Sequence, residues 1–219
     1  MSLAPSVFVV DDDISVRESL ESLIRLAGWH PQTFSSAQDF LAYPRVLTPS
    51  CLILDVSLPD FNGLDLQKRI ALDRRDMPII FITGYGDVPM TVKAMKAGAI
   101  EFLTKPFDAE ALLSAIRNAI ERSRNFLRRQ SEIDSLKECF ATLTTREREV
   151  LALVVAGLPN KKVGGELGIS EITVKAHRGR VMQKMGADSL PSLVKMAARL
   201  RIAPPRRETP ADAHSFRLS

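Results

Sequence analysis

Five polar residues stand directly after short apolar runs, and their side-chain types suit one kind of chemistry. They are Asp11, Asp12, Asp55, Thr83 and Lys105. Carboxylates crowded at one site repel one another, and Mg²⁺ (or Mn²⁺) removes that conflict by binding carboxylate, water and phosphate oxygens. A carboxylate can also accept a phosphoryl group, whose oxygens a hydroxyl and an ammonium can hold. The set predicts metal-assisted phosphoryl transfer onto Asp55, with Thr83 and Lys105 contacting the transferred group.

These residues meet only if the apolar runs are strands of one parallel sheet. Cys51–Leu54 lacks alternation, which is typical of a strand covered on both faces. Similar runs at Ser6–Val10, Pro78–Ile82 and Glu101–Thr104, with a weaker edge strand at Trp29–Phe34, alternate with helical spacings. The predicted fold class is α/β, a doubly wound five-stranded parallel sheet of the flavodoxin-like kind. Ligands bind such sheets at the carboxyl ends of the strands, where the polar set lies.

Composition and charge exclude several classes of protein. The 219 residues are 45% hydrophobic and 26% charged, as in a globular chain. No apolar run approaches the roughly 18–20 residues of a membrane span, and Met1–Pro5 lacks the features of a signal peptide. Two distant cysteines form no metal-ligand spacing, so a cytoplasmic setting is expected. No glycine-rich nucleotide-binding loop occurs.

The charge is divided unevenly along the chain. Residues 1–136 carry 15 basic and 18 acidic side chains, whereas residues 137–219 carry 15 and 8. This asymmetry predicts two domains, of which the second faces a polyanion. A merely solvated basic surface is the alternative.

The second half has the pattern of a small all-α domain. Thr144, Ser170 and Ser189 are in capping positions before predicted helices, and Asn160 begins another. Gly168 marks a tight turn between two of the four helices, which is typical of a helix–turn–helix that places its second helix in the major groove of DNA. The exposed side of that helix would carry basic residues, namely Lys175, His177, Arg178, Arg180 and Lys184.

The joint between the halves is predicted to be a long helix from Asp108 to about Thr142. Apolar residues recur every seven positions, at Leu112, Ala119, Phe126, Ile133 and Phe140. Such a repeat favours one helix that forms part of a two-stranded coiled coil. The alternative is two helices, each packed on its own domain, with a charged kink near Arg122–Arg124.

The first half resembles the receiver domain of bacterial two-component response regulators. The matching motifs are V-V-D-D-D, L-I-L-D-V-S-L-P-D-F-N-G, F-I-T-G-Y-G-D and F-L-T-K-P-F. The resemblance implies that a sensor histidine kinase phosphorylates Asp55. It also implies that Asp12 and Asp55 bind Mg²⁺ directly, Asp11 through water, and Ser57 through its carbonyl. Thr83 and Phe102 match the switch pair of the family, although many members have an aromatic hydroxyl in place of Phe102. Lys105-Pro106 matches a step that is usually cis.

The second half resembles the LuxR/FixJ-type DNA-binding domain. Its motifs are L-T-T-R-E-R-E-V-L, G-L-P-N-K-K-V, L-G-I-S-E-I-T-V-K-A-H-R and S-L-P-S-L-V-K. By position, Lys175, Ala176 and Gly179 would approach bases, although Gly179 has no side chain to contact them. The remaining DNA-binding candidates are Asn160, Lys161, Lys162, Thr173, Arg178, Arg180 and Lys184. The last helix corresponds to the dimerisation helix of the family.

Gly164 and Gly165 depart from good helix-forming sequence. Each costs about 1 kcal/mol relative to alanine, so the first helix of the motif is expected to be marginal in the free protein.

Together these patterns predict a phosphorylation-activated transcriptional regulator rather than an enzyme. The expected division is a receiver at 1–123, a helical linker at 124–142, a LuxR-type domain at 143–202 and a disordered tail at 203–219. The expected partners are double-stranded DNA, a sensor histidine kinase, a second copy of the chain and RNA polymerase, with no membrane. One alternative keeps the DNA binding but uses the receiver as an unphosphorylated dimerisation block. Another is a metal-dependent phosphatase or phosphotransferase, which would need a general acid where Ser57 stands.

Overall fold

The computed structural model describes residues 4–59, 61–84 and 88–202, and the chain divides into two compact units between Gln130 and Ser131. The predicted tail at 203–219 lies outside the described residues. Among the residues described, no helix is both long enough and apolar enough to cross a membrane.

The first unit is built on a five-stranded parallel sheet, as predicted. Its strands are β1 (Ser6–Val10), β2 (His30–Phe34), β3 (Ser50–Asp55), β4 (Ile79–Thr83) and β5 (Glu101–Thr104). Their order across the sheet is β2-β1-β3-β4-β5, so the weak strand lies at an edge. The register pairs Val10 with Leu54 and Asp55 with Ile82. The carboxyl ends of β1, β3 and β4 therefore lie side by side.

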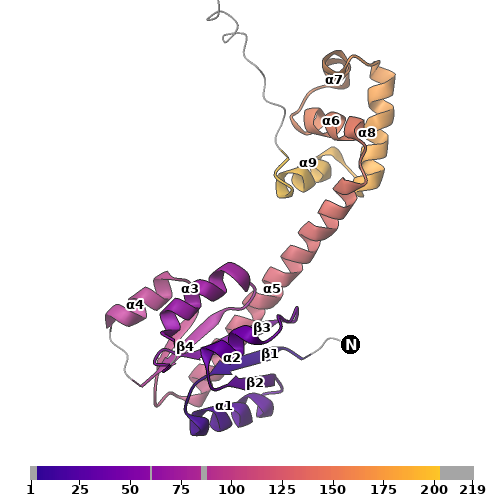
Figure 1. Ribbon diagram of the computed structural model, residues 1–219. Coiled ribbons are helices and arrows are strands. Elements are labelled where there is room, and N and C mark those ends of the chain that lie inside the picture. The colour runs from indigo at the N-terminus through magenta and orange to yellow at the C-terminus, as the bar shows by residue number, and fades with distance from the viewer. Residues whose placement is uncertain (1–3, 60, 85–87, 203–219) are drawn as a thin grey trace, which may run out of the picture. The chain divides into compact units, whose positions relative to one another are not determined.

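Helices cover both faces of this sheet (Figure 1). On one face, Leu20 and Ile24 of α1 (Ile14–Leu26) pack with the first part of α5 (Ala109–Ala141) against β1, β3 and β4. On the other face lie α2 (Ala37–Ala42), α3 (Gly63–Asp73) and α4 (Val88–Lys96). All residues of β1, β3 and β4 are buried, which explains their unbroken apolar runs.

The long joint is one helix, α5, as predicted, although its two parts pack on different units, as the alternative expected. Apolar residues of its seven-residue repeat pack into the cores of the two units. Leu112 and Ala119 are buried against the sheet, whereas Phe140 packs in the core of the second unit. Ser123 is buried too: its hydroxyl donates to the carbonyl of Asp76 at 2.5 Å and accepts from the amide of Ser50 at 3.0 Å. These contacts account for much of the repeat without a coiled coil.

The second unit is all-α, as predicted. Its helices are α6 (Thr145–Val155), α7 (Asn160–Leu167), α8 (Glu171–Met185) and α9 (Leu190–Arg199). The side chains of Thr144, Ser170 and Ser189 cap α6, α8 and α9, and Glu147 completes a capping box with Thr144. Gly168 ends α7 with φ 64°, a left-handed conformation that glycine adopts without strain.

The two glycines of α7 differ in their surroundings. A Cβ on Gly164 would lie 2.6 Å from the carbonyl oxygen of Ile169, whereas a Cβ on Gly165 would meet nothing within 4 Å. Gly164 is therefore required where α7 and the turn before α8 approach each other. Only Gly165 lowers helix stability without a packing reason.

Substitution of each glycine by alanine separates these effects. We expect G165A to stabilise α7 by about 1 kcal/mol and to slow amide exchange of residues 161–167 in the full chain. G164A should speed the same exchange, because its methyl group displaces the turn. Hydrogen exchange measured by mass spectrometry on the two variants checks this, and equal effects of the two would contradict it.

Candidate functional site

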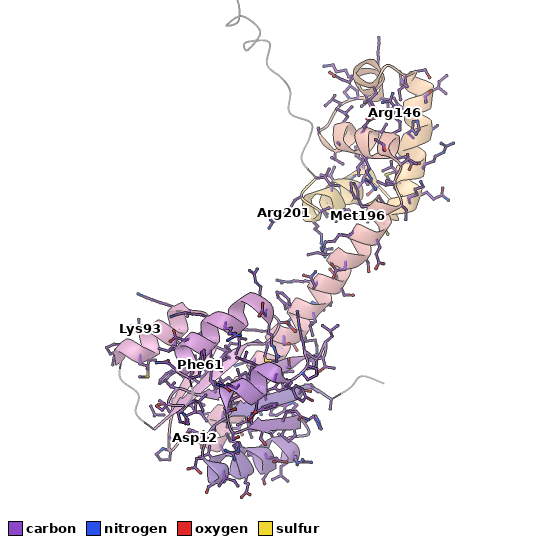
Figure 2. The ribbon with its side chains drawn as sticks, in the orientation of Figure 1. Asp12, Phe61, Lys93, Arg146, Met196 and Arg201 are labelled. Atoms are coloured by element: carbon purple, nitrogen blue, oxygen red, sulfur yellow. The ribbon has the colours of Figure 1, made fainter. Side chains whose placement is uncertain are left out.

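The structure brings the predicted carboxylates together at the carboxyl edge of the sheet. One carboxylate oxygen from each of Asp11, Asp12 and Asp55 lies within 4.8 Å of the other two. Asp11 and Asp55 are buried and Asp12 is exposed, on the edge labelled in Figure 2. The backbone amides of Asp13 and Ser57 donate to Asp11 and Asp55, each at 2.9 Å. The site is therefore an acidic cluster open to solvent on one side.

Lys105 lies between the two buried carboxylates. Its Nζ donates to Oδ2 of Asp11 and to Oδ2 of Asp55, each at 2.6 Å. Burial alone would lower the pKa of Lys105, but the hydrogen bonds to both carboxylates outweigh it and the pKa is raised. Burial raises the pKa of Asp11, and the hydrogen bonds from Lys105 and Asp13 offset it only in part. One ammonium thus faces three carboxylates, a set whose remaining negative charge fits a divalent cation.

The other residues of the first predicted set lie at neighbouring strand ends. Thr83 is buried at the end of β4, and its carbonyl accepts from the amide of Lys105 at 2.7 Å. Phe102 on β5 is half-buried, with its ring centroid 6.2 Å from that of Phe81. The Lys105-Pro106 peptide is cis, as the receiver resemblance implies.

Arg17 is a site residue that the sequence analysis missed. It lies on α1, and its Nη1 donates to the carbonyl oxygens of Asp11 at 2.7 Å and Asp12 at 2.8 Å. One guanidinium nitrogen therefore fixes the backbone of the loop that carries two of the three carboxylates. The sequence does place a basic residue, Arg17, one turn into the helix that follows D-D-D. It does not show where the long side chain of that residue points.

Gly63 lies against the backbone of Asp55 and Val56 at the end of β3. A Cβ at this position would lie 2.8 Å from the carbonyl oxygen of Asp55 and 2.9 Å from Cα of Val56. The amide of Gly63 donates to the carbonyl of Val56 at 3.1 Å. The first residue of α3 therefore packs directly on the backbone that ends β3.

The second unit presents the predicted helix–turn–helix, α7 and α8. Val174, Val181 and Met185 bury one side of α8. Several predicted DNA-binding residues are exposed, namely Lys161, Lys162, Thr173, Lys175, Ala176, Gly179 and Arg180. Asn160 and Arg178 are half-buried. Lys175 also pairs with Glu171 at 3.3 Å, an exposed ion pair that contributes little to stability.

Lys184 has a partner within the second unit. Its Nζ donates to Oε2 of the buried Glu147 at 2.7 Å and to the carbonyl of Thr142 at 3.1 Å. The hydrogen bond from Lys184, together with that from the amide of Thr144, lowers the pKa of Glu147 to about 2. We therefore assign Lys184 to holding α8 against the start of α6. The sequence grouped it with the DNA-binding residues because the pair is 37 positions apart.

Arg146 provides a second contact between α6 and the helix–turn–helix, and Figure 2 labels its position. Its Nη2 donates to the carbonyl of Leu167, the last residue of α7, and its Nη1 pairs with Glu149 at 2.7 Å. The first turn of α6 thus contacts both helices of the motif.

Comparison with known families covers both units. Residues 7–117 match the response regulator receiver domain, and residues 141–197 match the luxR family of bacterial regulatory proteins. The chain belongs to the LuxR-type response regulators.

Relatives of this family match along nearly the whole chain. Nodulation protein W of Bradyrhizobium diazoefficiens is 50% identical over 197 residues, which are 90% of this chain and 87% of that protein. The solved structure of the response regulator StyR has 47% identity and a TM-score of 0.80, over 90% of this chain and all of that one. Full-length FixJ from B. japonicum has 38% identity and a TM-score of 0.54, over 91% and 98%.

Membership of this family gives the two units their general roles. A receiver joined to a LuxR-type domain is the organisation of a two-component transcriptional regulator, whose partners are a sensor kinase and DNA. The predicted fold and function class are confirmed. The phosphatase alternative is not favoured, because the family consists of DNA-binding regulators.

Removal of Arg17 tests its part in the acidic site. We expect R17A to weaken Mg²⁺ binding about tenfold, because the loop carrying Asp11 and Asp12 loses its two hydrogen bonds. Isothermal titration calorimetry with MgCl₂ on the full chain checks this. R25A is the matched control, since Arg25 lies on the same helix and pairs only with Glu21 among the contacts observed. Tighter binding by R17A would show that Arg17 acts through charge repulsion instead.

The depressed pKa of Glu147 predicts a pH dependence for the second unit. A carboxylate whose pKa falls from 4.5 to about 2 on folding contributes stability above pH 4.5, which is lost as the pH drops through about 2. The difference in free energy of unfolding between wild type and E147Q should therefore shrink across this range in urea titrations. A constant difference would contradict the role of the pair. K184Q should reproduce the loss of stability; weakened DNA binding at unchanged stability would instead return Lys184 to the interface.

Proposed function

We propose that Asp55 is the phosphoacceptor of this response regulator. The observation that supports this most is the position of Lys105, whose Nζ is 2.6 Å from both Asp55 and Asp11. A carboxylate paired in this way keeps an oxygen available for attack on phosphorus, while the ammonium can follow the charge of the phosphoryl oxygens. Thr83, buried at the end of the neighbouring strand, donates its hydroxyl to the same group. The phosphoryl donor is the phosphohistidine of a sensor kinase.

The three carboxylates and the carbonyl of Ser57 are the groups that would hold Mg²⁺ (or Mn²⁺). Hard oxygen ligands with a net negative charge after the pairing with Lys105 suit this ion. When bound, the ion supplies positive charge to the phosphoryl oxygens during transfer. Arg17 keeps Asp11 and Asp12 in position, and the amide of Ser57 orients the carboxylate of Asp55.

Phosphorylation is proposed to act through Thr83 and Phe102. Movement of Thr83 toward the phosphoryl group frees space into which the half-buried ring of Phe102 turns, and the face between α4 and β5 changes. Helix α4 carries exposed apolar side chains, with Val88 77%, Val92 43% and Met95 42% exposed. Burial of these side chains between two copies favours a receiver homodimer.

The proposed output is sequence-specific binding of double-stranded DNA by residues 143–202, with residues 1–123 as receiver and 124–142 as linker. Lys161, Lys162, Lys175 and Arg180 neutralise phosphates, and α8 enters the major groove. Two linked modules on a two-fold site bind far more tightly than one, which couples dimerisation to affinity. Bound in this way, the dimer controls transcription by RNA polymerase.

Two measurements test the proposal. A small phosphodonor such as acetyl phosphate should label wild type and the exposed-site control D65N, but not D55N; undiminished labelling of D55N would refute the assignment.

Footprinting on genomic DNA should show two-fold sites occupied at about 100-fold lower protein concentration with the donor than without it. Identical footprints for wild type and D55N in both conditions would show that the receiver is a passive dimerisation block.

A further inference from the structure

The exposed face of α8 has an uncharged central row. Ile172, Ala176, Gly179 and Gln183 follow one another at spacings of four, three and four residues, which places them in line along a helix. All four are exposed. The row lies opposite Val174, Val181 and Met185, which anchor the helix in the core. The row is therefore the side of α8 that faces away from the core of the second unit.

Ile172 is the large side chain of this row and is 80% exposed. It occupies the second position of α8, two residues after the Ser170 cap, whose hydroxyl accepts from the amide of Thr173 at 3.1 Å. The first turn is therefore held rigidly, and no packing within the unit explains an isoleucine there. The early residues of a recognition helix are those that contact base edges in the major groove.

Gly179 is the one position of the row without a side chain. A Cβ at this position would meet nothing within 4 Å, so no neighbour among the described residues requires a glycine. In a helix interior it costs about 1 kcal/mol relative to alanine. The missing side chain lets the backbone of α8 approach a partner closely.

Cationic residues flank the row on both sides. Lys175 and Arg180 are exposed and lie to either side of the line from Ile172 to Gly179. The distribution suits a DNA groove, where cations contact the phosphates of the two strands and the middle of the helix faces base edges. Among the groups on those edges, the 5-methyl of thymine is the one that an isolated aliphatic side chain recognises.

We propose that Ile172 determines specificity by packing on the methyl group of a thymine in each half-site, with Gly179 permitting the close approach. This rests on the proposed DNA-binding function. Because only a methyl group is read, replacement of that thymine by deoxyuridine removes the contact and changes no hydrogen-bonding group of the base. The loss is about fourfold in affinity per half-site, the factor for one buried methyl-sized group.

The test uses the full chain treated with acetyl phosphate and a site obtained by footprinting. Each thymine of both half-sites is replaced in turn by deoxyuridine, and dissociation constants are measured for wild type and I172A. We expect one thymine per half-site whose replacement weakens wild type about fourfold and leaves I172A unchanged. L26A is the control, because Leu26 is 87% exposed on α1 of the other unit and should not alter the discrimination.

G179A gives a second readout. It should stabilise the second unit toward urea yet weaken binding to the same site, a combination that a purely structural role of Gly179 would not produce. If wild type binds selectively but no deoxyuridine distinguishes it from I172A, the role of Ile172 is refuted while the proposed function stands. If no selective DNA binding occurs, the proposed function itself fails.

Discussion

A single ammonium group between two buried carboxylates is the interaction on which the site of the first unit depends. Parallel strands bring Asp11 and Asp55 to the same edge, where burial raises the pKa of Asp11. Lys105 compensates part of that charge and comes from a third strand end, so the three strands must keep their register for the site to exist. The negative charge that remains on the three carboxylates suits a divalent cation.

The second unit also contains a buried carboxylate paired with a lysine, but this pair has a structural role. Glu147 is buried by the capping box of α6, and Lys184 neutralises it from the far end of α8. This ion pair is not part of a reactive site. It fixes the orientation of the recognition helix, and the bond from Arg146 to Leu167 fixes the end of the helix before it. The exposed face of α8 can then vary in sequence while its position stays constant.

Much of this architecture follows from local signals in the sequence. The strand ends, the caps at Thr144 and Ser170 and the turn at Gly168 depend on residues close together in the chain, where propensity and hydrogen bonding act directly. The contacts of Arg17 with the loop carbonyls and of Lys184 with Glu147 could not be predicted, because long flexible side chains find their partners through tertiary geometry. The seven-residue repeat near Ser123 predicts a buried side of the helix, but periodicity does not show whether the core of the same chain or a second helix covers that side.

The space around each glycine determines whether that position can accept a substitution without loss of the fold. At Gly63 and Gly164 a single methyl group would collide with backbone, so these positions tolerate almost no drift. At Gly179 the space is open among the described residues, and Ile172 on the same face of α8 is 80% exposed. A lineage carrying this fold can therefore acquire new operators by substitutions on one face of α8, each nearly neutral for folding, while the machinery that receives the signal stays fixed. Duplicated copies can diverge in the genes they control long before they diverge in how they are switched on.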